Sequence, residues 1–227
     1  MELEITLPEQ VPVMTLPNVT FFPQALMPLH IFEPRYREML RDVLASNRLF
    51  AVAGINEKLA GEPNQSEPPH RIASIGIVRA CQLNADGTSN LLLQGLCRVE
   101  VLEILSEVPY RQVRIRVLAS ESGGQSEETA RLRTELVRLL GLKQKLGGEV
   151  QPEITDFLRS VQDPETFVDL AAFSLCDSPP LKQKLLETLD LRTRLAIFSQ
   201  QLRREIEMLK LRRKLQGRLP DHLVSEN

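Results

Sequence analysis

Short apolar runs with the spacing of β-strands occupy the first half of the chain. They are bounded by proline, glycine and polar residues, and residues 110–118 alternate polar and apolar positions as a half-exposed strand does. Prolines within the early runs suit strand ends, bulges and edge strands. We therefore predict strands that curl into one sheet or a small barrel, over residues 11–16, 25–32, 49–55, 73–83, 89–105 and 110–118.

Glycines mark two irregular points in the predicted sheet. Asp86-Gly87 is a hairpin signal, because glycine accepts the positive φ that a tight turn needs. Gly95 interrupts the longest run, where we expect a bulge or bend. Residues 56–71 are rich in proline and polar residues, so we expect an exposed, mobile loop there.

A helical spacing replaces the strand pattern in two places. After Pro34, apolar residues recur at i, i+3, i+4 and i+7, which predicts one amphipathic helix among the strands. The second place is the whole chain after about residue 126, where Ser126 and Asp163 are candidate N-caps and Gly147 a candidate stop. The longest helix is predicted over residues 188–216, ended by Gly217 and Pro220.

This change of pattern predicts an α+β protein in which a β-barrel half precedes a helical bundle with a long final helix. The composition shifts at residues 119–127, and we place the boundary between the two halves there. The expected organisation is a flexible N-terminus (1–10), a barrel subdomain (11–119), a linker (120–126), a helical bundle (127–217) and a flexible C-terminus (218–227).

Charge and aromatic content narrow the range of ligands. The 28 Lys and Arg nearly balance the 30 Asp and Glu, which argues against a general polyanion binder. Trp is absent and aromatic residues make up 4%, so stacking platforms for single-stranded nucleic acid are not expected. The last helix is the exception: residues 192–218 hold nine basic residues against two acidic ones, a net of +7. RNA binding by this helix therefore stays open as an alternative.

The sequence carries no recognisable catalytic signature. It has no phosphate-binding GxxxxGK[ST] or GxGxxG loop, no GxSxG elbow and no HExxH pair. Its three histidines are dispersed, and its three cysteines form no metal-ligating pair. We expect no catalytic residue, metal or cofactor. There is also no signal peptide or apolar run of about 20 residues, so we expect a cytoplasmic protein without a membrane partner.

An apolar stretch broken by prolines is the candidate binding surface. Its large side chains exceed what one short strand can bury on one face, so some could remain exposed and bind flexible peptide. Packing in the core is the competing interpretation. The candidates are Phe21, Phe22, Met27, Leu29 and Phe32. Close by, Glu33 and Arg35 could contact a ligand or could form local charge pairs at the start of the helix.

The same stretch resembles the opening of the Lon protease N-terminal (substrate-binding) domain, in particular members without ATPase and peptidase domains. The motif is carried by Leu16-Pro17, Phe22-Pro23, Pro28-Leu29, Ile31-Phe32-Glu33 and Arg35-Tyr36. Further matching positions are Gly76, Asp86-Gly87, Gly95 and Arg98, and the likeness covers residues 11–217. The family often has glycine after the phenylalanine-proline pair, where this chain has Gln24.

The resemblance implies a PUA-like pseudobarrel followed by a helical bundle. It implies a structural role for the motif residues Pro17, Pro23, Pro28, Glu33, Arg35, Tyr36, Gly76, Gly95 and Arg98. In the full-length protease this region recognises unfolded polypeptide, whereas ATP hydrolysis and peptide cleavage belong to later domains. We therefore expect a non-catalytic protein that binds unfolded or flexible polypeptide or a protease partner, can self-associate, and serves as an adaptor in protein quality control.

Overall fold

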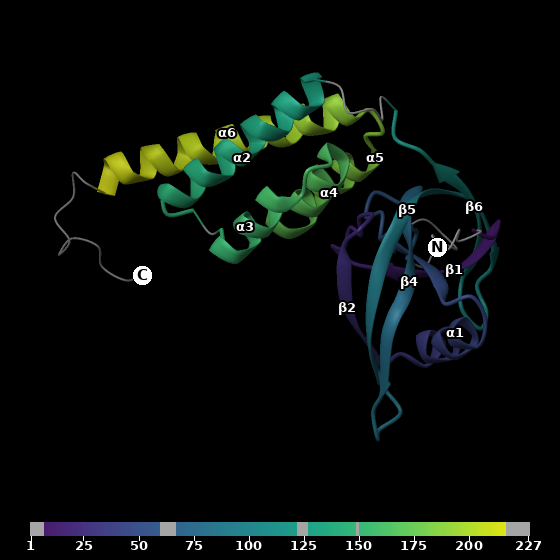
Figure 1. Ribbon diagram of the computed structural model, residues 1–227. Helices are drawn as coiled ribbons and strands as arrows, with labels where there is room; N and C mark the ends of the chain where they lie inside the picture. Colours follow the sequence, from purple (N-terminus) through teal and green to yellow (C-terminus); the bar gives the residue numbers. More distant parts are fainter. Residues whose placement is uncertain (1–6, 60–66, 122–126, 149, 217–227) are drawn as a thin grey trace. The chain divides into compact units, whose positions relative to one another are not determined.

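The structure is a computed structural model that describes residues 7–59, 67–121, 127–148 and 150–216 of the chain. Its contacts divide the chain into two compact units. The sheet unit comprises Met1–Ser120 and Cys176–Leu189, and the helical unit comprises Glu121–Leu175 and Asp190–Asn227. The predicted α+β class, the strands and the long final helix are confirmed (Figure 1).

The strands of the sheet unit close into a small barrel with one strand left over. They are β1 (Gln10–Leu16), β2 (Leu26–Ile31), β3 (Leu49–Gly54), β4 (Ile72–Leu83), β5 (Ser89–Ser106) and β6 (Gln112–Leu118). β5 has 18 residues; it pairs with β4, with β2 near its start and with β6 near its end. Since β6 also pairs with β1, the ring β1–β3–β4–β5–β6 is closed. Among the described strands, β2 pairs with β5 alone.

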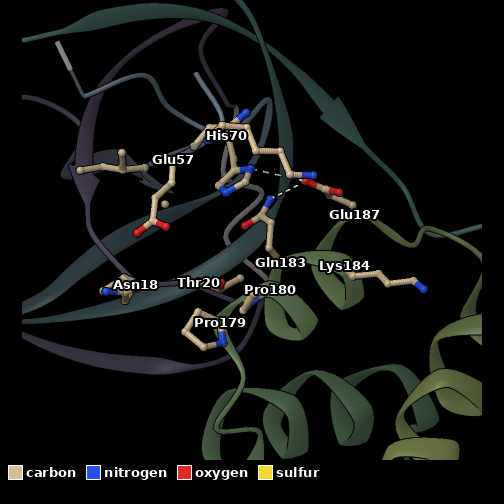
Figure 2. A pocket seen from close by; sticks show the side chains of 14 residues that line it. Asn18, Thr20, Glu57, His70, Pro179, Pro180, Gln183, Lys184 and Glu187 are labelled. Atoms are coloured by element: carbon tan, nitrogen blue, oxygen red, sulfur yellow. Dashed lines mark hydrogen bonds and ion pairs between the residues drawn. The ribbon is translucent and has the colours of Figure 1, made fainter. Parts of the chain in front are cut away.

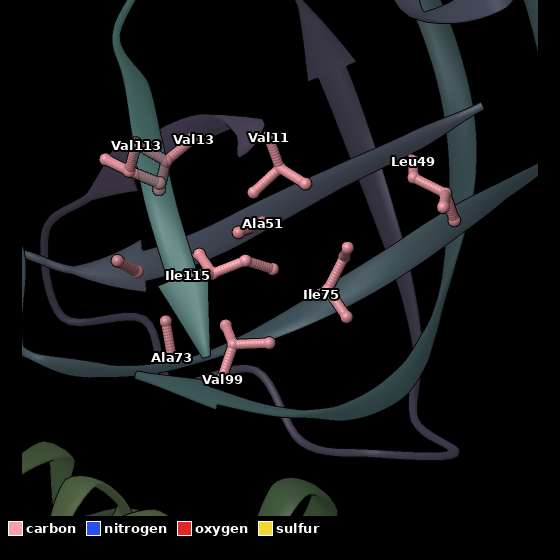
Figure 3. Packing of buried hydrophobic residues seen from close by; sticks show 10 residues of the cluster. Val11, Val13, Leu49, Ala51, Ala73, Ile75, Val99, Val113 and Ile115 are labelled. Carbon is pink, nitrogen blue, oxygen red and sulfur yellow. The ribbon is translucent and has the colours of Figure 1, made fainter. Parts of the chain in front are cut away.

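The barrel interior is filled by small and branched apolar side chains that alternate along the strands (Figure 3). Such alternation places every second residue inside, which is why the strand spacing was readable from the sequence. The buried cluster consists of Val11, Val13, Leu49, Ala51, Ala53, Ala73, Ile75, Val99, Val113 and Ile115.

The two predicted irregularities of the sheet are confirmed. Gly87 has a φ of 78° in the β4–β5 turn, a left-handed conformation that glycine adopts readily. Ile75 pairs with Cys97 whereas Gly76 pairs with Gly95, so β5 carries one extra residue in a bulge. The bulge bends β5 and allows one strand to serve both β2 and β6.

Helix α1 (Pro34–Ala45) interrupts the strands as predicted. Pro34 takes the first helical position, where its missing N–H costs nothing. One face is buried and the hydroxyl of Tyr36 on this face donates to the carbonyl oxygen of Thr15 at 3.2 Å. This hydrogen bond ties the start of α1 to β1.

The helical unit contains α2 (Glu127–Lys145), α3 (Pro152–Ser160), α4 (Pro164–Leu175) and α6 (Leu191–Gln216). Asp163 is the N-cap of α4, since its carboxylate accepts from the N–H of Thr166 at 2.8 Å. Gly147, with a φ of 78°, follows the end of α2. Both were predicted. The expected cap Ser126 and the expected stops Gly217 and Pro220 lie outside the described residues.

A buried ion pair stands at the centre of the helical unit. The side chain of Arg194 in α6 is completely buried, and its guanidinium lies 3.0 Å from the carboxylate of Asp169 in α4. The half-buried Glu165 adds a second contact at 3.3 Å. Burying charges is costly unless they are paired and hydrogen-bonded, so these helices depend on a specific polar contact as well as on apolar packing.

Helix α5 (Pro179–Glu187) lies within the range 127–217 that the sequence predicted as the helical bundle. Its contacts assign it to the sheet unit instead. Arg98 of β5 donates to the carbonyl oxygen of Leu186 at 3.0 Å, and Gln183 donates to that of Ile72 at 3.0 Å. An amphipathic pattern shows that a helix covers a surface but does not identify the surface.

The structure describes only part of the residues at the other predicted domain boundaries. Residues 1–6, 122–126 and 217–227, which include most of the predicted flexible ends and linker, lie outside the described residues. In the part that is described, no helix is both long enough and apolar enough to cross a membrane.

Candidate functional site

Strand β2 presents two chemically different sides because side chains alternate along it. Met27 and Ile31 are buried, and Leu29 between them is half-buried. Leu26, Pro28 and His30 point to the other side and are exposed. The register places them opposite Gln94, Leu92 and Asn90 of β5, respectively.

Three of the predicted peptide-binding residues are core residues, which corrects the prediction. Phe21, Phe22 and Met27 are at most 7% exposed and offer no surface to a ligand. Ser74 fixes the chain here, because its hydroxyl donates to the carbonyl oxygen of Phe21 at 2.6 Å. The excess of apolar residues in this stretch is absorbed because they pack from the segment before β2 as well as from β2 itself.

The exposed side of β2 continues into the residue that follows the strand. Phe32 is 61% exposed and Leu26, which the sequence did not single out, is 51% exposed. The rings of Phe32 and His30 stack with centroids 6.0 Å apart, and His30 is held by a 2.8 Å hydrogen bond to Asn90. We call Leu26, Pro28, His30 and Phe32 the β2 outer face.

The charged residues at the start of α1 are engaged with one another. The guanidinium of Arg35 donates to both carboxylate oxygens of Glu67, at 2.8 and 3.0 Å, and to Glu33 at 2.9 Å. The hydrogen bonds from Arg35 hold the pKa of Glu67 below its usual range. Of the two interpretations of Glu33 and Arg35, this geometry favours local pairs over a contact free for ligand.

Two of the motif glycines lie where a side chain has no room. A Cβ built on Gly95 would lie 2.1 Å from the carbonyl oxygen of Phe22. A Cβ on Gly76 would lie 2.8 Å from both Leu93 and Phe21. Neither site approaches a ligand surface, so these positions support the close packing of the segment before β2 onto the sheet.

The other motif residues surround the same segment. Pro23 is buried, Pro17 is exposed directly after β1, and Pro28 lies within the edge strand β2, where a missing N–H is tolerated. Gln24, which replaces the family's frequent glycine, has a φ of 62°. The turn therefore keeps a left-handed conformation without glycine, at a cost of roughly 1 kcal/mol.

A pocket of about 670 Å³ opens elsewhere on the sheet unit (Figure 2). Its walls come from the loop after β1, the end of β3 with the residues that follow it, His70, and one face of α5. Cavities of this size hold small ligands or short peptide segments. Sequence spacing could not reveal it, because the loops and α5 are more than a hundred positions apart in the chain.

Hydrogen-bonding side chains converge on this pocket from three segments (Figure 2). Gln183 donates from its amide nitrogen to Glu187 at 2.8 Å, and Nδ1 of His70 lies 3.8 Å from the same carboxylate. Burial lowers the pKa of His70 more than the attraction of Glu187 raises it, so the imidazole is neutral at pH 7. Thr20 lines the floor and is 5% exposed.

The described residues offer no catalytic constellation. No group of three or more His, Cys, Asp or Glu among them could hold a metal ion. None of the three cysteines forms a disulfide, and burial raises the pKa of the Cys97 thiol to about 11, so it is protonated at neutral pH. The β2 outer face offers apolar contact, and the pocket offers hydrogen bonding.

The chain is similar in sequence to part of several much longer proteases. A family model described as the ATP-dependent protease La (LON) substrate-binding domain matches residues 10–204. The chain is 28% identical over 221 residues to Lon protease of Dictyoglomus thermophilum, covering 96% of this chain and 27% of that protein. It is 28% identical to Lon protease of Heliobacterium modesticaldum, covering 93% and 26%. The chain thus spans about a quarter of the length of these curated relatives.

Solved structures show the same fold. The N-terminal domain of a Mycobacterium avium complex Lon protease superimposes with a TM-score of 0.64 at 18% identity, covering 87% of this chain and 98% of that one. A Lon N-terminal domain protein from Xanthomonas campestris gives a TM-score of 0.60 at 20% identity, covering 82% and 95%. The pseudobarrel with a helical half is therefore a shared architecture.

Proposed function

Because the chain belongs to the ATP-dependent protease La (LON) substrate-binding domain family, we propose that it binds unfolded or flexible polypeptide by reversible apolar contact and catalyses no reaction itself. The family description supports a substrate-binding role. The nature of that substrate and the surface that meets it are the new parts of the proposal.

The observation that carries the proposal is the β2 outer face. Leu26 in the edge strand β2 and Phe32 directly after it are both more than half exposed, and Pro28 lies between them on the same exposed side. Unfolded chains expose apolar side chains that folded proteins bury, so an exposed apolar surface selects for them. Burying a side chain of this size contributes roughly 1.5–3 kcal/mol, which gives weak, reversible binding.

The relatives that match are proteases in which this region is one part of a longer chain. We propose accordingly that a polypeptide held on the β2 outer face is passed to a protease, with this chain acting as an adaptor in protein quality control.

RNA binding by α6 rests on charge alone. Arg212, Arg213 and Lys214 are exposed at its end, but Arg194 is buried against Asp169 and Arg218 lies outside the described residues. No aromatic side chain accompanies the exposed cations for stacking in this part of the described helix. Polypeptide binding is therefore the function that the geometry favours.

Fluorescence anisotropy of a labelled, permanently unfolded polypeptide titrated with the purified chain tests the proposal. We expect saturable binding that changes little between two salt concentrations, and that neither a folded protein nor RNA displaces. Displacement by RNA together with a steep salt dependence would move the function to the basic end of α6, because each phosphate contact releases counterions. Absence of binding to the unfolded polypeptide would refute the proposal.

A further inference from the structure

We propose that the pocket against α5 is a second binding site, which takes an uncharged stretch of polypeptide main chain through its amide groups. This inference rests on the proposed function and deepens it: the same polypeptide that contacts the β2 outer face would place a few residues of its backbone in the pocket. Charge, hydrogen bonding and the start of α5 each support this ligand class.

The charges that line the pocket cancel. Glu57 and Glu187 oppose Lys58 and Lys184, and Figure 2 shows the ammonium group of Lys184 directed away from the pocket. A site for phosphate or a nucleotide needs a surplus of cations, and a site for a metal ion needs a cluster of carboxylates. A lining without net charge suits an uncharged polar ligand.

The start of α5 is modified in a way that disfavours anions. A helix N-terminus usually binds anions through its free backbone N–H groups. Here Pro179 and Pro180 occupy the first two helical positions and have no N–H, and the N–H of Leu181 already donates to the Ser178 hydroxyl at 3.4 Å. The prolines instead line the pocket with apolar rings, as do the side chains of Val19 and Ile55.

The hydrogen-bonding groups that remain match a peptide unit, which has one N–H donor and one C=O acceptor. The amide nitrogen of Gln183 is engaged by Glu187 and by the carbonyl oxygen of Ile72, which leaves its amide oxygen as an acceptor. The neutral His70 ring can donate or accept. The Thr20 hydroxyl has no hydrogen-bond partner among the described residues although Thr20 is 5% exposed.

Thr20 is the informative group, because it lines the pocket and its hydroxyl has no hydrogen-bond partner among the described residues. A bound amide could therefore form a hydrogen bond with it. Thr20→Val removes the hydroxyl and keeps the shape. We expect this variant to bind the unfolded polypeptide about fivefold more weakly, the worth of one neutral hydrogen bond, while its unfolding midpoint stays the same or rises.

A pair of variants at exposed positions tests whether filling the pocket blocks binding. The side chain of Glu57 extends into the pocket in Figure 2, so Glu57→Trp should fill it; Lys184→Trp on the opposite rim, where the side chain points away, is the matched control. Both positions are exposed, so both variants should fold. We expect Glu57→Trp to weaken binding of the unfolded polypeptide about tenfold and Lys184→Trp to leave it unchanged. Equal affinities for the two variants would overturn the inference.

A direct probe separates this inference from the proposed function. We would add N-acetyl-tetraalanine amide, which has main-chain amides and no charge, and follow the ring protons of His70 by NMR. A saturable shift that Glu57→Trp abolishes and that adenosine monophosphate does not reproduce is expected. No shift would reject the pocket as a main-chain site even if the unfolded polypeptide binds elsewhere. A shift without binding of the unfolded polypeptide would reject the proposed function and keep the pocket.

Discussion

Two local regions, one in the helical unit and one in the sheet unit, hold their polar and apolar groups in opposite ways. The helical unit encloses charge, with Arg194 completely buried against Asp169. The sheet unit leaves Leu26 and Phe32 exposed and keeps the Thr20 hydroxyl in a pocket without a partner among the described residues. Groups that are fully satisfied inside the protein serve architecture, whereas groups left unsatisfied at a surface are available to a ligand.

The largest expected change in stability comes from removing one charge of the buried ion pair in the helical unit. Asp169→Ala removes the buried carboxylate that pairs with the completely buried Arg194, so we expect the free energy of unfolding to fall by about 3–5 kcal/mol. Chemical denaturation followed by circular dichroism measures the loss. Replacing both partners, as Asp169→Leu with Arg194→Met, should recover most of it. A single variant as stable as the wild type would show that the ion pair is not structural.

A matched disruption of the sheet unit is Gly95→Ala. The new Cβ would lie 2.1 Å from the carbonyl oxygen of Phe22, and the resulting overpacking should cost roughly 1–3 kcal/mol of unfolding free energy. Gly141→Ala in α2 is the control, because the nearest atom there lies 3.5 Å away, and alanine favours a helix over glycine by about 1 kcal/mol. Equal midpoints for the two variants in urea would contradict the close-packing role of Gly95.

Acid should lower the free energy of unfolding through the protonation of His70, which lines the pocket of the sheet unit. Burial keeps the folded-state pKa of His70 below its unfolded value of about 6.5, so below that pH the unfolded chain takes up a proton that the folded protein resists. Stability therefore falls as the pH drops through this region. Urea midpoints measured at neutral and mildly acidic pH should differ less in His70→Asn than in the wild type. An equal difference in both proteins would exclude His70 as a source.

The smallest expected effect compares two hydroxyls that have no hydrogen-bond partner among the described residues. The Oγ of Ser199 in α6 is fully buried inside the helical unit, whereas Thr20 lines the pocket. Ser199→Ala should raise the unfolding free energy by about 1 kcal/mol or leave it unchanged, and should not alter polypeptide binding. Thermal unfolding and the anisotropy titration measure both. Weaker binding in Ser199→Ala would remove the distinction drawn between the two units.

The sequence predicted the elements of both units but only part of their surfaces. Strand periods, the Asp86-Gly87 turn and the bulge at Gly95 were readable because each follows from local geometry. The exposure of Leu26 and the burial of Phe21 were not, since both depend on where neighbouring segments pack. A large apolar side chain has the same appearance in the sequence whether it fills the core or remains outside.

The pocket and the position of α5 were beyond sequence reasoning for a different reason. Gln183 meets Ile72, and Arg98 meets Leu186, only after the chain has formed the helices between them. His70, one of three histidines dispersed along the sequence, lines the pocket together with residues of α5. Contacts between distant segments carry no periodic signal in a single sequence.

The most direct test of the central claim compares the wild type with the double variant Leu26→Ser/Phe32→Ser in the anisotropy titration with unfolded polypeptide. Phe157→Ser is the control, since Phe157 is 56% exposed on α3 of the helical unit. The β2 outer face predicts about tenfold weaker binding or more in the double variant, with an unchanged unfolding midpoint and no loss in the control. Wild-type affinity in the double variant would contradict the account.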